Sequence, residues 1–156
     1  MLRSSQAAPE RLPSFARWLG VAGLVPQILL AALLIGGPAE FRLPASGLAL
    51  SYSGLILSFI GGAWWGLASR HKEPVAAWIW CAAVAPSLIA FAGLGACAFG
   101  GRPGPGLLLI GTALIGALGI DGKLNAAGLC PAGWLGLRAP LSLGLGGLTI
   151  LIAVFA

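Results

Sequence analysis

Five stretches of this chain are apolar over nearly the length that a membrane-spanning helix needs. They cover residues 15–35, 47–67, 74–99, 105–121 and 139–156. The hydrocarbon core of a bilayer is about 30 Å thick, and a helix that rises 1.5 Å per residue crosses it in about twenty residues. The third stretch is longer than this and predicts a tilt or a kink, whereas the last two are short and are expected to extend into their charged flanks.

Charged residues are too few to cover a water-exposed surface. They make up 8% of the 156 residues, while 58% are hydrophobic, and a soluble domain carries about a quarter charged residues. The outside of the folded chain must therefore face lipid. We predict an all-α, polytopic transmembrane bundle of five helices, with residues 1–13 as a polar cytoplasmic tail and residues 14–156 as a single domain whose main partner is the lipid bilayer.

The basic residues indicate how such a bundle is oriented. Five spans place the N-terminus, the second loop and the fourth loop on one side of the membrane, and that side holds seven basic residues: Arg3, Arg11, Arg17, Arg70, Lys72, Lys123 and Arg138. The other side holds only Arg42 and Arg102. Because Lys and Arg stay on the cytoplasmic side, the sequence predicts N-in and C-out. The long apolar run and the lack of an A-x-A site favour an uncleaved first span over a signal peptide.

All six tryptophans fall at the cytoplasmic end of their helices in this orientation. Trp65 is one, and the other five are predicted to be interface anchors: Trp18, Trp64, Trp78, Trp80 and Trp134. Tryptophan favours the headgroup layer of a bilayer, usually at both boundaries. The one-sided set therefore predicts either anchoring in the inner headgroup layer or a contact surface for a partner on that side.

The second span carries a face of small and weakly polar residues. At 100° per residue the following fall on or beside one stripe: Ser51, Gly54, Ser58, Gly61, Gly62, Trp65 and Gly66. Helices in lipid associate through close backbone approach at such residues. The stripe predicts a helix-packing seam, mainly inside the protein and also suited to a homo-oligomer, in which bulk at Gly62 would force two helices apart.

The first and third spans share a pattern that recurs after sixty residues. Pro26 is followed by Gln27, and Pro86 is followed by Ser87, each pair near the middle of its span. A proline inside a helix frees the carbonyl four residues earlier, so that polar groups or a ligand can bind it. These four residues predict either a midplane pocket between two kinked helices, as transporters build from duplicated halves, or two bent helices satisfied by their neighbours.

The remaining chemistry is sparse. One His, three Cys without metal-ligand spacing and four acids give little material for a metal site, a disulfide or an acid–base pair, and the scattered basic residues do not form the stripe that nucleic acid requires. We therefore expect no cofactor, no metal, no nucleic-acid partner and no enzymatic activity. Asp121 and Arg138 are expected to form an ion pair at the inner boundary. An enzyme would need both of them to converge with His71 in one pocket.

Two segments resemble a known family. One is residues 52–66, whose core reads Ile-Leu-Ser-Phe-x-Gly-Gly-x-x-Trp-Gly, and the other combines Asp121 with residues 131–134 and 137–142. These segments are similar to domain of unknown function 3429, the uncharacterised membrane family that includes transmembrane protein 69, and the likeness begins at about Leu12. The resemblance implies a multi-pass protein of a bacterial inner membrane, or of the mitochondrial inner membrane if the source is eukaryotic, and it brings no established activity, cofactor or catalytic residue.

Two functions fit these features. The first is a non-enzymatic accessory or assembly partner of another membrane component, which acts through the seam and through contacts at the inner face. The second is a carrier or binding protein for a small or lipophilic solute, which uses the pocket at the Pro26 and Pro86 kinks.

Overall fold

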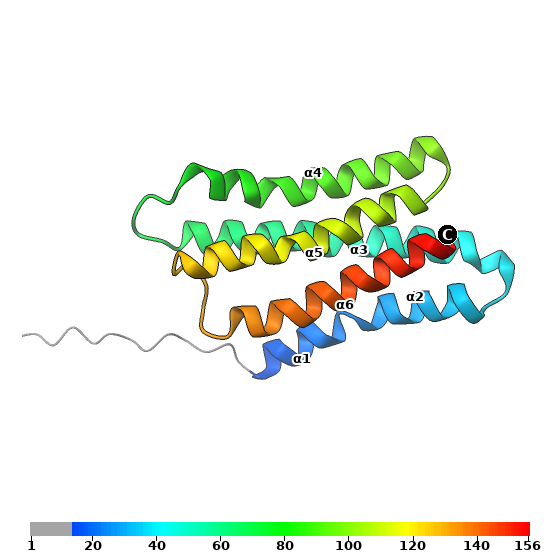
Figure 1. The fold of residues 1–156 in the computed structure, drawn as a ribbon, viewed down its shortest axis with the longest axis horizontal. Helices are drawn as coiled ribbons and strands as arrows, with labels where there is room; N and C mark the ends of the chain where they lie inside the picture. Colours follow the sequence, from blue (N-terminus) through cyan, green and yellow to red (C-terminus); the bar gives the residue numbers. More distant parts are fainter. Residues whose placement is uncertain (1–13) are drawn as a thin grey trace, which may run out of the picture.

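The computed structural model describes residues 14–156, which form six α-helices and one short 3-10 helix in an elongated bundle (Figure 1). The elements are α1 (Ser14–Ala22), α2 (Val25–Gly36), η1 (Ala39–Phe41), α3 (Arg42–Ser69), α4 (Ala77–Gly100), α5 (Gly104–Ala126) and α6 (Trp134–Phe155). The predicted cytoplasmic tail, with Arg3 and Arg11, lies outside the described residues.

Five helical stretches of the described chain are long and apolar enough to cross a membrane. They are Arg17–Gly36, Ala39–Ser69, Ala77–Gly100, Gly104–Ala126 and Trp134–Phe155. The prediction of an all-α bundle of five spans is confirmed, and the protein is a multi-pass membrane protein. Both of the short predicted spans continue into their charged flanks, because α5 runs on past Asp121 and α6 begins before Arg138.

The first span is two helices separated by a tight turn. Helix α1 ends at Ala22 and α2 begins at Val25, and the backbone N–H of Leu24 bonds to the carbonyl of Val21 in the turn. Pro26 follows this break in the first turn of α2, where its missing N–H has no helical partner to lose. Pro86, in contrast, lies inside a continuous α4.

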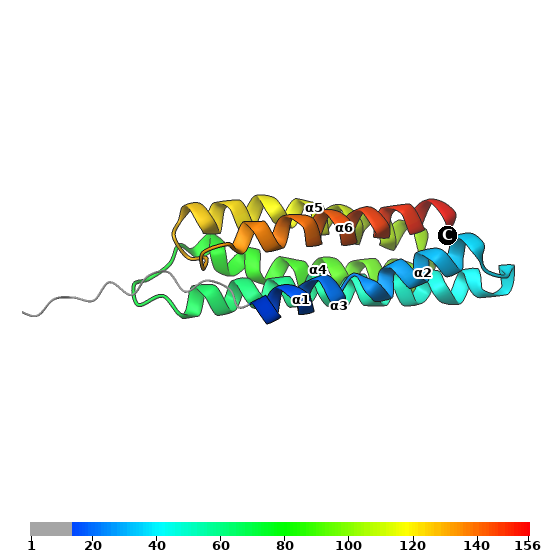
Figure 2. The ribbon, with the colours of Figure 1, turned by 90° about the horizontal axis from the view of Figure 1, so that it is seen from below.

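The helices form two layers. Helices α5 and α6 lie over α1, α2, α3 and α4, as Figure 2 shows. Helix α3 is central, since it packs against α2, α4, α5 and α6. The loops 70–76 and 127–133 lie at the end of the bundle where the chain enters α1, and the C-terminus lies at the other end (Figure 1).

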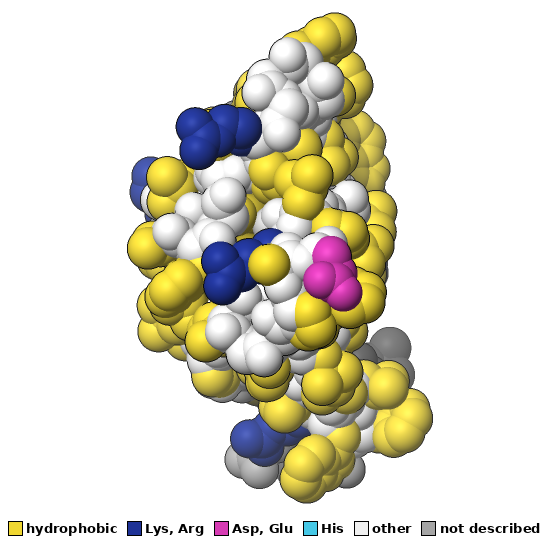
Figure 3. Space-filling model, turned by 90° about the vertical axis from the view of Figure 1, so that its right-hand side faces the viewer, with side chains coloured by type: hydrophobic (Ala, Val, Ile, Leu, Met, Phe, Trp, Pro, Cys, Tyr) yellow, Lys and Arg dark blue, Asp and Glu magenta, His cyan; other side chains and the backbone are white. Residues whose placement is uncertain are grey.

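Charge is concentrated at the ends of the bundle, and the sides are apolar. We call the end formed by loops 70–76 and 127–133 the basic end, since the charged side chains toward it are Arg17, Arg70, Lys72, Glu73, Asp121, Lys123 and Arg138. The opposite end, seen in Figure 3, presents few charges on a mostly apolar or uncharged surface. Large apolar side chains such as Phe91 and Phe99 are exposed on the sides, as contact with lipid tails requires.

Glycine sets the distance between neighbouring helices. A Cβ atom on Gly61 of α3 would collide with the carbonyl oxygen of Ala83 and press on Pro86, both in α4. Gly106 of α5 meets Gly93 of α4 in the same way, and α5 and α6 meet through one further glycine pair, Gly111 and Gly146. Without side chains at these positions, the backbones approach closely enough for strong dispersion contacts.

The predicted seam divides into a packed part and an exposed part. Gly54 and Gly61 are buried against α4, and Ser58 is half-buried. The other members are exposed within the single chain: Ser51, Gly62, Trp65 and Gly66. The expectation that bulk at Gly62 forces two helices of the chain apart was wrong, because a Cβ there meets no atom within 4 Å.

These contacts predict opposite outcomes for two adjacent glycines. Gly61→Leu should lower the free energy of unfolding by about 1–3 kcal/mol or more, since the leucine must displace the backbone of α4. Gly62→Leu is the matched control and should leave the stability of the monomer nearly unchanged. Thermal unfolding in detergent measures both, and equal unfolding temperatures for the two variants would contradict the α3–α4 contact described here.

Candidate functional site

The structure separates the residues of the predicted midplane pocket. Gln27 of α2 is completely buried and donates through Nε2 to Thr149 Oγ1 of α6 at 3.0 Å. Pro86 packs on Gly61, and Ser87 is exposed. Because α2 and α4 lie on different sides of α3 (Figure 1), the two proline sites do not face each other. The predicted pocket at Pro26, Gln27, Pro86 and Ser87 was therefore wrong.

The break between α1 and α2 is satisfied within the protein. The hydroxyl of Tyr52 in α3 donates to the carbonyl oxygen of Gly23, in the turn between the two helices. This bond ties the first span to α3 on one side of the turn. Helix α1 itself has few contacts with the rest of the bundle, and its main neighbour is α6.

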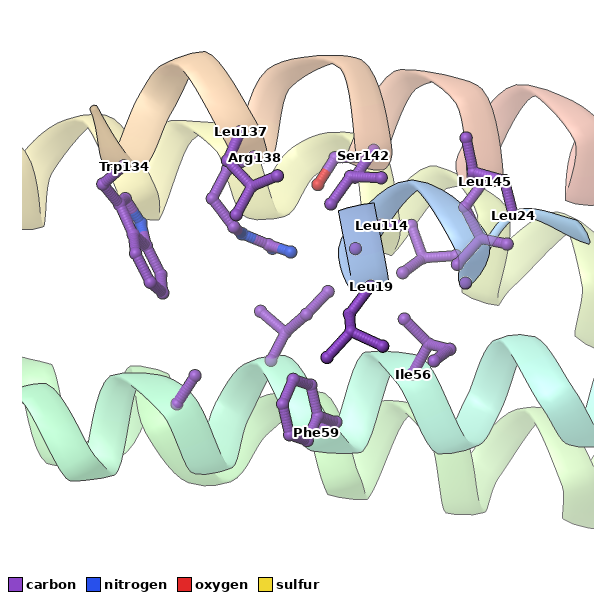
Figure 4. A pocket seen from close by; sticks show the side chains of 15 residues that line it. Leu19, Leu24, Ile56, Phe59, Leu114, Trp134, Leu137, Arg138, Ser142 and Leu145 are labelled. Carbon is purple, nitrogen blue, oxygen red and sulfur yellow. The ribbon is translucent and has the colours of Figure 1, made fainter. Parts of the chain in front are cut away.

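A cavity of about 480 Å³ lies between α1, α3, α5 and α6. Its size falls within the range of small-molecule sites, roughly 300–1,000 Å³. Figure 4 shows the side chains that project into it. The lining residues are Leu19, Gly20, Gly23, Leu24, Ile56, Phe59, Ile60, Ala63, Leu114, Trp134, Leu137, Arg138, Leu141, Ser142 and Leu145.

The edges of the cavity are formed by the short first helix and by α3. Gly20 of α1 packs closely against the side chains of Leu137 and Leu141 on α6. Leu19 and Phe59, on the two helices that flank the cavity, are 58% and 73% exposed. The cavity therefore opens on the apolar side of the bundle, toward lipid, between α1 and α3.

Two polar side chains point into this apolar space. Arg138 and Ser142 are one turn apart on α6, and both project into the cavity (Figure 4). Ser142 is only 2% exposed. Ser142 Oγ and Arg138 Nη2 are two of the three buried side-chain atoms of the described residues that lack a hydrogen-bond partner, and Gln27 Oε1 is the third. Leaving such a group unpaired costs about 1–3 kcal/mol in a protein interior.

A buried carboxylate holds the arginine in this position. Asp121 of α5 is fully buried, and its Oδ2 accepts from Arg138 Nε at 3.0 Å. Its Oδ1 accepts from the indole N–H groups of Trp64 at 2.8 Å and Trp134 at 2.9 Å. The ion pair expected from the sequence is thus part of a larger cluster that joins α3, α5 and α6. We call these four residues the Asp121 cluster.

The tryptophans do not share one role. Trp18, Trp65 and Trp78 are exposed, while Trp80 is half-buried and its ring meets that of Trp65 edge to face, with centroids 4.7 Å apart. Trp134 is half-buried and lines the cavity.

Trp64 is 2% exposed and lies in the core, so its assignment as an interface anchor was wrong. The reason is its indole N–H, which faces the Asp121 carboxylate instead of the headgroup layer. The sequence places tryptophan and aspartate at the same depth but does not show that they face each other. Their partnership is the feature of the site that sequence reasoning missed.

The other reactive side chains lie apart from the cavity. His71 is exposed in the loop between α3 and α4, and no group of three metal-ligating side chains occurs among the described residues. Cys130 lies in the loop between α5 and α6, where burial, with the Asp121 carboxylate adding to it, raises the pKa of its thiol to about 11. This thiol is therefore protonated at neutral pH and is a poor nucleophile.

Comparison with known proteins places the chain in a family. Residues 12–155 match the family described as "Protein of unknown function (DUF3429)". The chain belongs to this family. No curated protein and no solved structure matches it. For this member of DUF3429, the cavity and the Asp121 cluster are therefore the features from which a function must be argued.

The Asp121 cluster predicts strong coupling between its two charges. Asp121→Asn leaves the Arg138 charge buried without its counter-ion and should lower the free energy of unfolding by about 3–5 kcal/mol. Arg138→Met, which leaves the carboxylate without its cation, should cost a similar amount. The double variant should lose much less than the sum of the two, as measured by unfolding in detergent. Additive losses would show that the pair contributes little.

Proposed function

We propose that this DUF3429 protein is a non-enzymatic membrane protein that binds a lipophilic solute in the cavity between α1, α3, α5 and α6. The observation that carries the proposal is a pair of buried, unpartnered polar atoms, Arg138 Nη2 and Ser142 Oγ, on two residues that line an otherwise apolar cavity. A few polar groups on mostly apolar walls are typical of small-molecule sites.

Imperfect packing of the helices explains the two unpartnered polar atoms less well than a ligand does. Elsewhere in the bundle, buried polar groups mostly find partners, as the hydrogen bonds of Gln27 Nε2 and the Asp121 carboxylate show, and Gln27 Oε1 is the one further buried side-chain atom of the described residues without one. A ligand that accepts hydrogen bonds from Arg138 and Ser142 would remove the cost of leaving them unpaired.

Catalysis is not part of this proposal. The Asp121 carboxylate already accepts hydrogen bonds from three side chains, and it does not line the cavity. It is suited to hold Arg138 in place and poorly suited to act as a general base, which needs access to the proton that it removes.

A role as accessory or assembly partner is the second candidate. The exposed part of the seam favours it, because Ser51, Gly62 and Gly66 offer a second helix the close backbone approach that the chain itself leaves unused. The partner would be another membrane protein or a second copy of this chain. The Gly62→Leu variant, which should fold normally, would lose such a partner and keep any bound solute.

We also propose that the protein is oriented N-in and C-out in a bacterial inner membrane, or in the mitochondrial inner membrane if the source is eukaryotic. The support is the charge difference between the two ends of the bundle. Five basic residues of the described chain lie toward the basic end, whereas Arg42 and Arg102 lie at the other.

Filling the cavity should remove the solute. Ala63→Phe places a ring in the cavity, and Ala92→Phe, on the exposed face of α4, is the matched control. Native mass spectrometry of protein extracted with mild detergent should find about one small molecule per chain in the wild type and the control, and much less in Ala63→Phe. The same occupancy in all three proteins, or none in any, would overturn the binding function.

The orientation can be tested by cysteine labelling. In a background with Cys81, Cys97 and Cys130 changed to alanine, Ala39→Cys and Ala127→Cys place a matched thiol at each end of the bundle. A membrane-impermeant maleimide added to intact cells should label Ala39→Cys at once. It should label Ala127→Cys only after permeabilisation, and the reverse pattern would contradict the N-in and C-out arrangement.

A further inference from the structure

We propose that the solute is a single-chain amphiphile with an anionic oxygen head, which binds to Arg138 and Ser142 while its chain leaves the cavity toward lipid. This inference rests on the proposed binding function and adds the chemistry of the ligand. It combines three observations: the kind of polar group in the cavity, the charge around it, and the size and opening of the space.

The polar groups select an oxygen head that accepts hydrogen bonds. A guanidinium group can donate but not accept, and Arg138 uses Nε on Asp121 while Nη2 has no partner. Ser142 Oγ, one turn further along α6, adds a second donor that is 2% exposed and unpartnered. Carboxylates and phosphates match the planar fork of arginine better than other head groups do.

The surrounding charge favours an anion over a neutral acceptor. Asp121 neutralises Arg138 as a pair, but its negative charge is also shared by two indole donors, which bind its other oxygen. Toward the basic end the described chain carries five basic residues against two acids, Glu73 and Asp121. The net positive field of this end would stabilise a negative head at the depth of Arg138.

The dimensions of the cavity fit one chain. A methylene group takes up about as much space as a water molecule, whose share of liquid volume is about 30 Å³. The cavity of about 480 Å³ therefore has room for one acyl chain of on the order of sixteen such groups. The opening between Leu19 and Phe59 lets a longer chain continue into the bilayer.

Photo-crosslinking with a defined probe tests this inference. The full chain is placed in phosphatidylcholine nanodiscs at about pH 8, well above the ordinary carboxyl pKa of about 4, and labelled with a diazirine-bearing stearic acid. Unlabelled stearic acid, its methyl ester and stearylamine then compete for the labelled peptides of α3 and α6. Stearic acid should compete at least tenfold better than the ester or the amine, because only the acid offers an anion to Arg138.

Two variants separate recognition of the head from the stability of the fold. Ser142→Ala should weaken competition by stearic acid about tenfold, since a hydrogen bond to a charged group is lost, without lowering the unfolding temperature, because Ser142 Oγ has no partner to lose. Arg138→Lys keeps a cation beside Asp121 and should also lose the preference for the acid. Ser87→Ala, an exposed serine outside the cavity, should behave as the wild type does.

The outcomes distinguish this inference from the binding function itself. Equal competition by the acid, the ester and the amine would show that lipid chains fill the cavity without recognition of the head, which overturns the inference and leaves binding intact. No labelling of the cavity by any probe would overturn both. Lysophosphatidic acid competing better than stearic acid would identify phosphate as the source of the anion. Two-chain phosphatidic acid competing as well as stearic acid would overturn the assignment of a single chain.

Discussion

A bilayer offers no water to the polar groups that a membrane protein buries, so each must find its partner within the fold. Asp121 is the most demanding such group in this bundle, because it is an acid that is completely buried. It is stabilised by Arg138 and by the indole groups of Trp64 and Trp134. Since these partners come from α3 and α6, the carboxylate joins three helices near the basic end. A bundle with little other polar contact depends on this cluster for the relative positions of those helices.

Glycine sets how closely the helices pack around the cavity. Where glycines of two helices face each other, as Gly93 and Gly106 do, the backbones approach closely and leave no space. Gly20 of α1 also permits close packing, because a Cβ there would lie 3.0 Å from Leu141 and 3.2 Å from Leu137 on α6. The turn at Gly23, held by Tyr52, fixes where α1 leaves α2. The cavity lies beside these contacts, between α1, α3, α5 and α6.

Much of the fold follows from the sequence, because the thickness of a bilayer fixes the length of each apolar stretch. The five spans, their extension past Asp121 and Arg138, and the pairing of these two charges all come from spacing along the chain. The side of a helix that faces a neighbour is much harder to infer. The chain has 25 glycines, so small-residue stripes occur on several faces, and the one on α3 packs within the chain at Gly61 but is exposed at Gly62.

The candidate site was misplaced for a similar reason. Proline was taken as the sign of a pocket, yet Pro26 begins a helix and frees no interior carbonyl, whereas Pro86 is packed against Gly61. The cavity instead depends on how α1, α3, α5 and α6 lie relative to one another, which is a property of the tertiary arrangement. Arg138 was identified from the sequence only as half of an ion pair. Pairing opposite charges in a sequence assigns one partner to each of them. A guanidinium group has five N–H donors, and those that Asp121 does not use are free to bind a ligand.

The contrast within the Asp121 cluster is the strongest reason to regard the cavity as a site. The carboxylate at its centre is bound on both oxygens, whereas the guanidinium that it orients keeps Nη2 unpaired. If the cluster served packing alone, an apolar side chain at Arg138 and at Asp121 would do so without the cost of burying two charges. Retaining both makes physical sense when the carboxylate fixes the arginine for a further partner. A ligand bound there would complete the hydrogen bonding of the cluster, and its presence would then be linked to the packing of α3, α5 and α6.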